Sequence, residues 1–550
     1  MNLIRKPVAA AVLLAMALGP AWQQAAFAAS ERESLEVLRQ TTLNLIDGLV
    51  DQGIFTREKA DAMIRAAERK AASAAAATAR EPEKAATVRV QYVPEVVKNE
   101  IREQIKQEVI AQARNERWAE PNAVPRWLDG IKLEGDLRLR YQTDRFDRHN
   151  TVPLDYIIQS VTSYTTRAAD LLGTTSASPA PSANTTANRD RLRLRARLGI
   201  LASIADEWKG GLRLATGSAA DRVSTNQTLG QDWNKYSLLV DRAYLTYAPV
   251  DWLGITGGRI ANPWFSTDLV WDEDLNFEGL AATIKPADTD RTLVPFLTVG
   301  AFPLKEKNPP AASGRWVRGI QGGGQWNISP AVRLKVGAAL YDFNKLEGQV
   351  EDNTAYLAGN AAYGQYEYGR NLRQKGNTLF RTNAPDDYNS ASIWGLASRF
   401  RPANLTASLD LGQFDPVHLI LTGDWVKNTR FDPAEIRART GVDLVDGKDY
   451  GYQYKLVVGM PQVKNRRDWQ VSAAYRYLGS DAVVDAFTDS DFGLGGTNLK
   501  GYILGLQYGL DKNAVLGLRW IAADSISTFT MNPDHRYSVD VLQADVNVRF

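Results

Sequence analysis

Cysteine is absent from this chain of 550 residues, and histidine is scarce, being limited to His149, His418 and His535. The missing thiols exclude disulfides, thiolate catalysis and cysteine-ligated zinc or iron–sulfur sites. Three histidines that lie far apart in the sequence give little support to chemistry that needs an imidazole. Neither a Ser–His–Asp order nor an H-E-x-x-H motif stands out. We therefore expect no enzyme, no catalytic residue, no metal site and no cofactor.

Long hydrophobic runs are missing as well. After the N-terminus, no stretch approaches the roughly 18 apolar residues that a membrane helix needs, which excludes a helical membrane protein. A strong charge of either sign is also lacking, because 65 Lys and Arg face 63 Asp and Glu. This balance argues against a nucleic-acid partner held by bulk charge. Tryptophan (14), tyrosine (21) and glycine (42) are plentiful, so β-rich chains remain, either soluble or in an outer membrane.

The first 28 residues have the pattern of a secretory signal peptide. Arg5 and Lys6 form a basic start, residues 7–18 form a short apolar core, and residues 26–28 (Ala-Phe-Ala) form a small-x-small cleavage site. The apolar core is too short for a membrane anchor, and no cysteine follows the site to carry a lipid. We expect export across a bacterial inner membrane.

From Ile131 onward the hydrophobic period is two, which is typical of β-strands. In residues 131–143 the odd positions are mostly apolar, and the even ones carry Lys, Glu, Asp, Arg, Arg and Gln. In the next clear strand, the apolar residues of 192–200 alternate with arginines at 191, 193, 195 and 197. One face of each strand is therefore apolar and the other is charged.

Three features favour a transmembrane barrel over a soluble β-protein, whose strands can also alternate. The strands have about 10 residues, enough to cross a bilayer when tilted. Short turns alternate with long loops, as in outer-membrane barrels. Aromatic residues recur at strand ends and match interfacial girdles: Trp208, Trp252, Trp326, Trp469, Trp520 and Phe550.

The alternating segments predict an all-β fold, a transmembrane antiparallel β-barrel of about sixteen strands over residues 131–550. The predicted strands are 131–143, 190–205, 207–217, 238–248, 252–262, 276–286, 292–302, 317–328, 331–342, 391–413, 417–427, 450–460, 469–478, 499–508, 514–523 and 536–550. Residues 391–413 are long enough for two strands. We expect one long or bulged strand there, because single-chain bacterial barrels have even strand numbers. Long loops are expected near 144–189, 217–237, 262–276, 303–316, 343–390, 428–449, 479–498 and 524–535.

The bilayer explains why such a sheet must close. Hydrocarbon cannot satisfy backbone N–H and C=O groups, so only a sheet without edges survives there. Closure at about sixteen strands leaves a lumen wide enough for water. The charged face of each strand then points into that lumen.

Residues 29–118 are expected to form a helical periplasmic segment with an alanine-rich tract, followed by a linker over 119–130. Near its end, four apolar residues step by four and form one stripe, which must bury against something: Val97, Ile101, Ile105 and Val109. The sequence leaves open which of three partners buries this stripe. The helices could pack on each other or on the barrel, associate into a coiled-coil-like bundle that makes a homotrimer, or contact the cell wall.

Several stretches together resemble the putative porin family of Gram-negative bacteria. They are residues 92–98 (YVPEVVK), 135–140 (GDLRLR), 258–263 (GRIANP), 489–493 (DSDFG) and the closing 547–550 (NVRF). The resemblance implies an outer-membrane channel whose partners are membrane lipid and small hydrophilic solutes or ions. The terminal Phe550 on an alternating strand also resembles the signal that the barrel-assembly machinery reads.

Arginines from three strands adjacent in sequence are the first candidate pore-lining group. We call them the arginine ladder: Arg138, Arg140, Arg191, Arg193, Arg195, Arg197 and Arg213. If the strands pair as neighbours, the ladder forms a positive wall of the lumen. Two interpretations stay open, a solvated wall with structural ion pairs to Glu134 and Asp136, or a wall that steers ions. Arg333 and Lys335 add positive charge on a later strand.

The loop over residues 262–276 is the second candidate. In sixteen-stranded porins the loop at this place in the order folds inward, and by resemblance this loop would narrow the lumen. Trp264, Phe265 and Trp271 would pack it against the wall, and its acids would face the arginines across the opening: Asp268, Asp272, Glu273 and Asp274. The alternative is an extracellular loop with exposed acids or a calcium site.

Two smaller features complete the prediction. Asp489 and Asp491, in another long loop, are interpreted as surface or turn residues. The glycines at 322–324 lie in a strand pattern, so they fit a barrel wall or the close approach of an inward loop, not a phosphate-binding loop. The predicted function is a porin for passive diffusion of small hydrophilic solutes or ions. The alternative is a structural or adhesive outer-membrane barrel with a blocked lumen.

Overall fold

The structure is a computed structural model. It describes residues 130–150, 159–160, 184–308, 312–350, 365–369, 372–382, 393–440, 448–526 and 536–550. The expected signal peptide, the expected helical segment and, apart from Gly130, the expected linker lie outside the described residues. No described helix is long and apolar enough to span a membrane.

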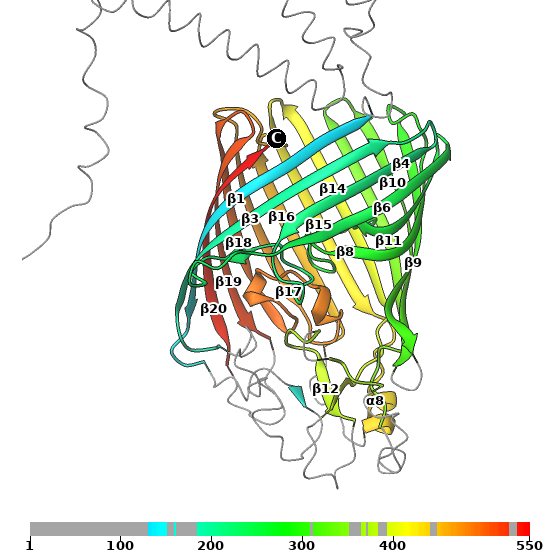
Figure 1. Ribbon diagram of the computed structural model, residues 1–550, viewed down its shortest axis with the longest axis vertical. Coiled ribbons are helices and arrows are strands. Elements are labelled where there is room, and N and C mark those ends of the chain that lie inside the picture. The colour runs from blue at the N-terminus through cyan, green and yellow to red at the C-terminus, as the bar shows by residue number, and fades with distance from the viewer. Residues whose placement is uncertain are drawn as a thin grey trace, which may run out of the picture. The chain divides into compact units, whose positions relative to one another are not determined.

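Sixteen of the described strands close into one antiparallel barrel (Figure 1). In chain order they are β1 (Ile131–Phe146), β3 (Arg189–Ser203), β4 (Trp208–Thr216), β6 (Leu238–Val250), β7 (Leu253–Ala261), β8 (Asn276–Ile284), β9 (Leu293–Asn308), β10 (Ala312–Ser329), β11 (Val332–Asn344), β14 (Pro402–Phe414), β15 (Val417–Asn428), β16 (Tyr450–Gly459), β17 (Trp469–Leu478), β18 (Leu499–Asp511), β19 (Ala514–Ser525) and β20 (Ser538–Arg549). Each pairs with the next in this order. The strand count and the fold class predicted from the sequence are confirmed.

The first and last strands complete the ring. β1 pairs with β20 in a register that runs from Asp136 opposite Arg549 to Phe146 opposite Val539. The chain end continues this contact, since the backbone N–H of Phe550 donates to the carbonyl of Gly135 at 3.0 Å and the reverse bond has the same length. On its other edge β1 pairs with β3. The ring therefore leaves no open strand edge at this seam, as a sheet in hydrocarbon requires.

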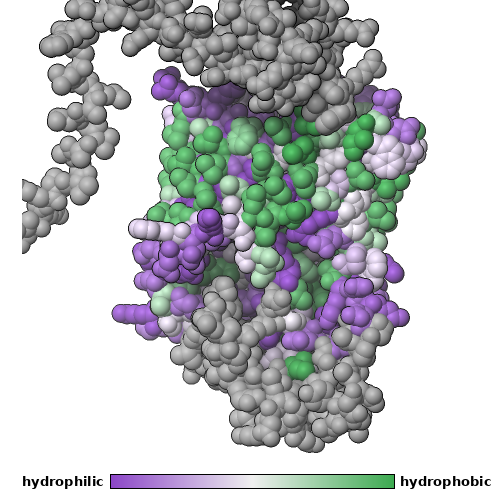
Figure 2. Space-filling view, viewed as in Figure 1, coloured by the Kyte–Doolittle hydropathy of each residue, from purple (hydrophilic) through white to green (hydrophobic). Residues whose placement is uncertain are grey.

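The alternation of apolar and charged residues sorts the two faces of the wall. On β3, Leu192 is 58% exposed and Leu198 is 43% exposed, whereas Arg195 is 6% exposed. The leucines therefore face outward and the arginines face the interior. Figure 2 shows the result on the near side of the barrel, where an apolar band separates polar surfaces above and below it. Such a band is what a bilayer demands of the outer surface.

The two ends of the barrel differ. Short turns join strands at the end where the C-terminus lies, and the long loops gather at the other end (Figure 1). Trp208, Trp252 and Trp326 are exposed close to the short turns. Amphipathic rings at this height match the interfacial girdle expected from the sequence.

Two strand boundaries differ from the prediction. Residues 391–413 do not form one strand: β14 begins at Pro402, and β13 (Trp394–Leu396) belongs to a separate small sheet with β12 (Thr378–Arg381) and β2 (Gln159–Ser160). The expected long loop at 303–316 is instead mostly a β-hairpin, because β9 continues to Asn308 and β10 begins at Ala312, with Arg315 opposite Lys305. Both segments lie beyond the bilayer-spanning part, where alternation need not follow the barrel wall.

The remaining described elements are short and lie between the barrel strands. They are β5 (Gln227–Thr228), α8 (Pro433–Thr440), η2 (Asp485–Phe487) and η3 (Phe492–Leu494). η2 and η3 both belong to the loop between β17 and β18, and the chain of this loop enters the barrel (Figure 1).

Candidate pore constriction

The arginine ladder is assembled by strand register. β1 pairs with β3 so that Arg138 lies opposite Arg195 and Arg140 opposite Arg193. β3 then pairs with β4, which carries Arg213. The three strands are therefore neighbours in the wall, and the seven arginines lie on its inner face. The alternation predicted this placement, because inward positions recur every second residue.

Carboxylates accompany most of these arginines. Arg195 and Arg197 share Asp136, with closest nitrogen–oxygen distances of 2.9 and 2.6 Å. Other pairs join Arg140 to Asp545 at 2.7 Å, Arg191 to Asp144 at 2.6 Å, and Arg213 to Asp241. Glu134, expected as a second counter-charge, stands opposite Gly199 of β3 rather than opposite an arginine. Pairing of this kind lets a dense row of guanidinium groups remain buried.

Two ladder members differ from the rest. Arg138 donates to the side-chain oxygen of Asn226 at 2.6 Å, and Arg193 donates to that of Gln142 at 3.1 Å. Among the described residues, neither arginine has a carboxylate within ion-pair distance. An amide oxygen accepts a hydrogen bond but does not neutralise the charge. These two arginines therefore carry positive charge on the inner wall without a direct ion pair, and the nearby carboxylate of Asp491 acts on both of them.

The loop over residues 262–276 crosses the inside of the barrel. It leaves β7, and Phe265 exchanges two hydrogen bonds with the side chain of Gln321 on β10, at 2.7 and 2.8 Å. Further along, the backbone N–H of Thr267 donates to Asp424 on β15 at 3.0 Å. Asp268 then reaches Arg476 on β17 at 2.7 Å. Because β17 stands opposite β7 in the ring of barrel strands, these contacts require the loop to span the lumen.

Aromatic side chains hold this inward loop against the wall between β8 and β11. Trp264 lies edge-on to Tyr341 with ring centroids 5.2 Å apart, and Trp271 lies edge-on to the same tyrosine at 5.1 Å. Glycine makes room for them, since a Cβ atom on Gly319 would come within 2.6 Å of Trp264. A Cβ on Gly337 would come within 3.0 Å of Phe265. Small wall residues thus allow the close approach of an inward loop, although here the glycines are neighbours of the 322–324 triplet rather than the triplet itself.

The acids of the loop divide between two sides of the lumen. Asp274 faces the arginine ladder and contacts Arg197 at 3.1 Å. Asp268 faces away from the ladder toward Arg476, and Asp272 accepts the backbone N–H of Ser490 at 2.8 Å. The expectation that all four acids face the ladder is therefore wrong, because a second loop enters between them and the wall. Asp272 and Asp274 are buried, which also contradicts the alternative of an extracellular loop with exposed acids.

That second loop spans residues 479–498, and it corrects the interpretation of Asp489 and Asp491 as surface or turn residues. Asp489 is buried and contacts Arg476 at 2.9 Å. Asp491 lies between Arg140 and Arg519, at 3.1 Å from each. The DSDFG stretch thus places two carboxylates inside the barrel, where they join β1 to β17 and β19.

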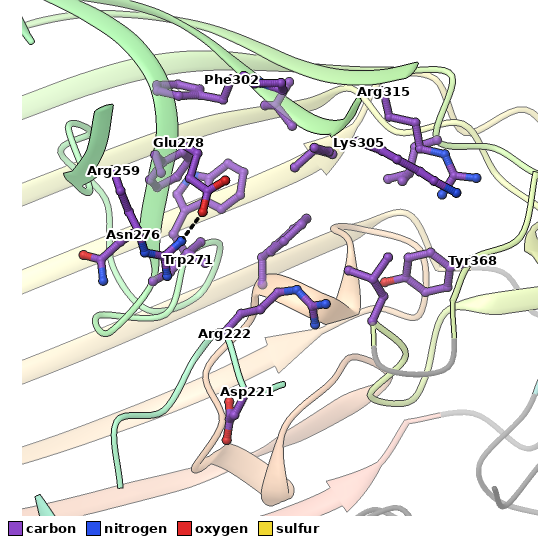
Figure 3. Close-up of a pocket in the computed structure, with 18 of the residues that line it drawn as sticks. Asp221, Arg222, Arg259, Trp271, Asn276, Glu278, Phe302, Lys305, Arg315 and Tyr368 are labelled. Carbon is purple, nitrogen blue, oxygen red and sulfur yellow. Dashed lines mark hydrogen bonds and ion pairs between the residues drawn. The ribbon is translucent and has the colours of Figure 1, made fainter. Parts of the chain in front are cut away.

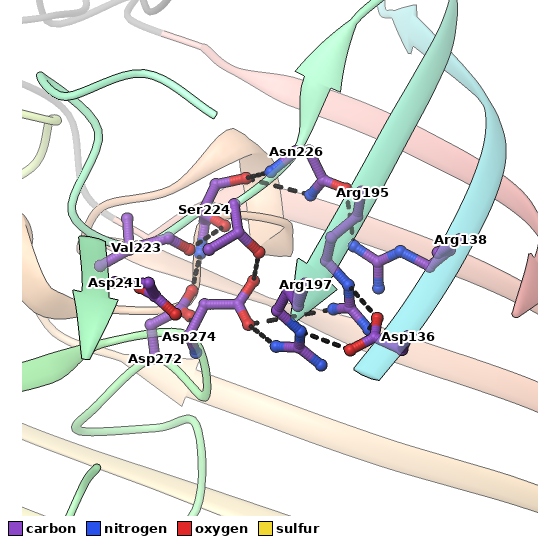
Figure 4. A network of polar contacts seen from close by, with 12 residues as sticks. Asp136, Arg138, Arg195, Arg197, Val223, Ser224, Asn226, Asp241, Asp272 and Asp274 are labelled. Carbon is purple, nitrogen blue, oxygen red and sulfur yellow. Dashed lines mark hydrogen bonds and ion pairs between the residues drawn. The ribbon is translucent and has the colours of Figure 1, made fainter. Parts of the chain in front are cut away.

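A narrow gap remains between the two inward loops and the wall that carries the ladder. Figure 4 shows Asp274 of the inward loop in contact with Arg197 of the ladder. The cavity of the gap measures about 20 Å³, room for only one or two water molecules. Positive groups on the barrel wall and negative groups on the loops line it together: Arg138, Arg519, Asp268, Asp272, Glu273, Asp274, Asp489 and Asp491. Opposite charges therefore face each other across this gap inside the barrel.

Burial and neighbouring charges act on the loop acids in different directions. Burial raises the pKa of Asp489 to about 6 and raises that of Asp272 well above its usual value, where the charge of Asp489 adds to the effect. Burial would also raise the pKa of Asp268, but the guanidinium of Arg476 lowers it below its usual range. The acids in the gap therefore titrate over a wide pH range. Groups of at least three His, Asp or Glu side chains that could hold a metal ion are not found among the described residues.

Contacts between residues 365–382 and the loop 479–498, here called the loop clamp, hold the second loop in place. Thr378 donates to Asp481 through its hydroxyl at 2.6 Å and through its backbone N–H at 3.0 Å. Tyr368 donates to Asp485, and the Nζ atom of Lys375 donates to the carbonyl of Gly493 at 2.6 Å. These buried polar contacts hold the loop from the end of the barrel where the long loops lie.

The sequence analysis missed Arg476 and Arg519. Each is the one charged residue among the inward positions of an otherwise apolar or small strand, β17 or β19. A lone charge at an inward position was the available signal. Of the later-strand cations that were noted, Arg333 pairs with Asp410 at 2.9 Å, and the Lys335 ammonium lies 4.2 Å from the centre of the Phe265 ring.

A closed barrel with an apolar exterior, a charged interior and loops folded into its lumen defines the class of transmembrane β-barrel channels. The chain belongs to the putative porin family, whose model matches residues 39–550. The protein is thus an outer-membrane channel protein, and its family and fold are typically those of channels without enzymatic activity. A search of curated proteins found no match.

Solved structures that match this chain share little sequence with it. OprB of Pseudomonas putida is 11% identical, with a TM-score of 0.42, over 77% of this chain and 95% of that one. DcaP, an outer-membrane channel of Acinetobacter baumannii, is 11% identical, with a TM-score of 0.38, over 76% and 97%. Salmonella typhi OmpF, solved with daunomycin, is 10% identical, with a TM-score of 0.38, over 77% and 99%.

Proposed function

We propose that the protein is a passive diffusion channel for small hydrophilic solutes or ions, and that its residues act by electrostatics and steric exclusion without covalent chemistry. The observation that carries the proposal is the gap between the two inward loops and the ladder. There, arginines of the wall face carboxylates of the loops across a space of water size. A transverse arrangement of opposite charges sorts ions and polar solutes by charge as well as size.

The selectivity residues follow from this arrangement. The ladder would attract anions, and Arg138 and Arg193 would contribute most because they lack a carboxylate partner among the described residues. Asp272, Glu273 and Asp274 would set the opposing field from the inward loop. The ion preference would then depend on the balance at the gap rather than on the net charge of the chain.

Neutralising the loop acids tests the proposal. The variant Asp272→Asn/Asp274→Asn, reconstituted in planar bilayers under a salt gradient, should shift the reversal potential toward anion selectivity. Asp288→Asn/Asp290→Asn is the matched control, because these acids lie in a short turn at the other end of the barrel. Unchanged conductance and selectivity in the first variant would discard the constriction. Silence of the pure, folded, heat-modifiable wild type would favour the alternative, a structural or adhesive barrel with a blocked lumen.

Two further expectations from the sequence stay proposals. Association of the N-terminal segments would give a homotrimer, and crosslinking that yields only monomer would contradict it. Recognition of Phe550 by the barrel-assembly machinery would make insertion depend on the terminal ring. Deletion of Phe550 should then lower the amount of folded barrel in the outer membrane.

A further inference from the structure

A second cavity, of about 340 Å³, lies beside the constriction in the part of the barrel near the long loops (Figure 3). It is bounded by the inward loop 262–276, by β7 to β10 and by the loop 479–498. Its volume lies within the range of about 300–1,000 Å³ that is usual for small-molecule sites. The cavity is separate from the gap, because Trp271 lines the cavity while its neighbours Asp272 and Asp274 line the gap.

One part of the cavity is apolar and aromatic. Trp271, Phe277 and Phe302 form a cluster, with ring centroids 5.0 Å apart for the first two and 4.9 Å apart for the last two. Phe487 adds a fourth ring, 6.0 Å from Trp271. These rings are mostly buried against one another, with no more than 7% of any of the four residues exposed, and the cavity borders them. Such a surface offers no polar contacts to replace the water molecules that a bare inorganic ion would lose there.

The other part of the cavity is cationic. Four basic and two acidic side chains line this part, so the formal charge of the lining is +2. The basic residues are Arg222, Arg259, Lys305 and Arg315, and the acidic ones are Asp221 and Glu278. Glu278 already pairs with Arg259 at 2.5 Å, and Asp221 accepts the backbone N–H of Val223 at 3.1 Å. Lys305 is exposed, and Arg315 donates to the backbone carbonyl of Gln365 at 3.0 Å. In Figure 3, the polar ends of Arg222, Lys305 and Arg315 lie around the open space, away from the aromatic cluster.

We propose that this cavity is a binding site for a small organic anion with a flat apolar body, an aromatic monocarboxylate of the size of benzoate. The ring would lie against the aromatic cluster, and the carboxylate would meet the cationic side, where charged N–H donors bind it strongly. An aliphatic acid lacks the ring, a neutral aromatic lacks the charge, and a cation meets the wrong sign. If the channel conducts, aromatic monocarboxylates are a class of solute that it would carry, and this part of the inference rests on the proposed function. Binding of the anion to the cavity does not require conduction.

Equilibrium binding to the full-length protein, folded in detergent, tests the site with benzoate as the probe. Isothermal titration should show saturable binding of benzoate, whereas acetate and benzyl alcohol should bind about tenfold more weakly or worse, equivalent to about 1.4 kcal/mol each. Equal affinity for benzyl alcohol would overturn the role of the cationic side. Equal affinity for acetate would overturn the role of the aromatic cluster, and absence of benzoate binding would overturn the site.

Two variants with opposite expected effects exclude a simple folding defect. Lys305→Gln should weaken benzoate binding about threefold to tenfold, since it removes a charge that interacts through partly solvated space. Lys307→Gln, on the same strand but outside the cavity lining, should leave the affinity unchanged. Glu278→Gln should tighten binding, because it releases Arg259 and removes a competing carboxylate. The proposal would be overturned if neither Lys305→Gln nor Glu278→Gln changed the affinity for benzoate. It would also be overturned if Lys307→Gln weakened benzoate binding as much as Lys305→Gln does.

Single-channel recording on the same samples separates this site from the proposed function. Benzoate binding by a protein that shows no conductance steps would support the site and contradict the diffusion channel. Conductance steps without benzoate binding would support the channel and contradict the site.

Discussion

Asp268 of the inward loop and Arg476 of β17 form a 2.7 Å ion pair across the lumen from the strand where the loop begins. Arg476 is buried, and its second carboxylate, Asp489, comes from the other inward loop. One guanidinium therefore joins both loops to the wall. The position of each loop depends on the other through this shared partner.

Removing one carboxylate of this group should loosen the loop 262–276. Breaking a buried ion pair typically costs about 3–5 kcal/mol, and the remaining contact with Asp489 keeps the expected loss in Asp268→Asn below that range. Because the cost falls on the loop and not on the barrel, single-channel recordings should show more frequent current fluctuations. Asp288→Asn, which breaks an exposed pair with Arg291 in a short turn, is the control. Fluctuations identical to wild type in Asp268→Asn would show that the pair does not hold the loop.

Charge at the ladder should affect ion preference most where the arginine is in no direct ion pair. Arg138→Gln should shift the reversal potential toward cations, because the lost charge has no carboxylate partner among the described residues. The comparison variant is Arg145→Gln, whose arginine is half exposed and pairs with Asp190 at 2.9 Å. Measured under the same salt gradient, Arg145→Gln should leave the reversal potential near the wild-type value. A shift of similar size in both variants would contradict the special role of Arg138.

The loop clamp should tighten in acid. Burial raises the pKa of Asp481 and of Asp485 to about 6, above the value of about 3.9 for an exposed aspartate. The packed clamp therefore binds more protons than the released loop between about pH 4 and pH 6, so its stability falls as the pH rises through this window. The difference corresponds to at most about 3 kcal/mol per carboxyl.

Hydrogen exchange of the amides in residues 480–497 at pH 5 and pH 7, corrected for intrinsic exchange rates, measures this effect. Protection should be greater at pH 5, and Asp485→Asn should reduce the difference between the two pH values. Asp511→Asn, which changes an exposed acid at the end of β18 beside a short turn, should leave the difference unchanged. Protection that rises with pH would refute the assignment.

The seam between the chain ends depends on a glycine. A Cβ on Gly135 would come within 2.4 Å of the Phe550 ring and within 2.7 Å of the carbonyl of Arg197. Gly135→Val should therefore displace the terminal ring and destabilise the folded barrel by about 1–3 kcal/mol. The temperature at which the folded form is lost on semi-native gels should fall relative to wild type. Gly254→Val, where no neighbouring atom lies within 4 Å, should keep the wild-type temperature, and an equal fall in both would contradict the clash.

Alternation predicted the barrel because the membrane enforces it at every position of the wall. Leu192 and Arg195 could be assigned to opposite faces from parity alone, and the pairing of β1 with β3 followed from adjacency. Parity says nothing about a loop once it leaves the wall. The inward path of residues 262–276 was expected only by resemblance, and the inward path of Asp489 and Asp491 was missed, because both depend on partners such as Arg476 that are distant in sequence. Residues 391–413 were misjudged for a related reason, since extended structure outside the bilayer carries a similar pattern.

The pairing of β1 with β20 has a consequence for how the protein is made. The first strand finds its second neighbour only when the last residues of the chain are available, so a nascent polypeptide carries two unsatisfied β edges throughout its transit. Unpaired edges of this kind are templates for aggregation, and contacts so remote in sequence form slowly. Because the ring closes only through these last residues, truncation at the carboxyl end should be far more harmful to biogenesis than an equal deletion in any of the long loops.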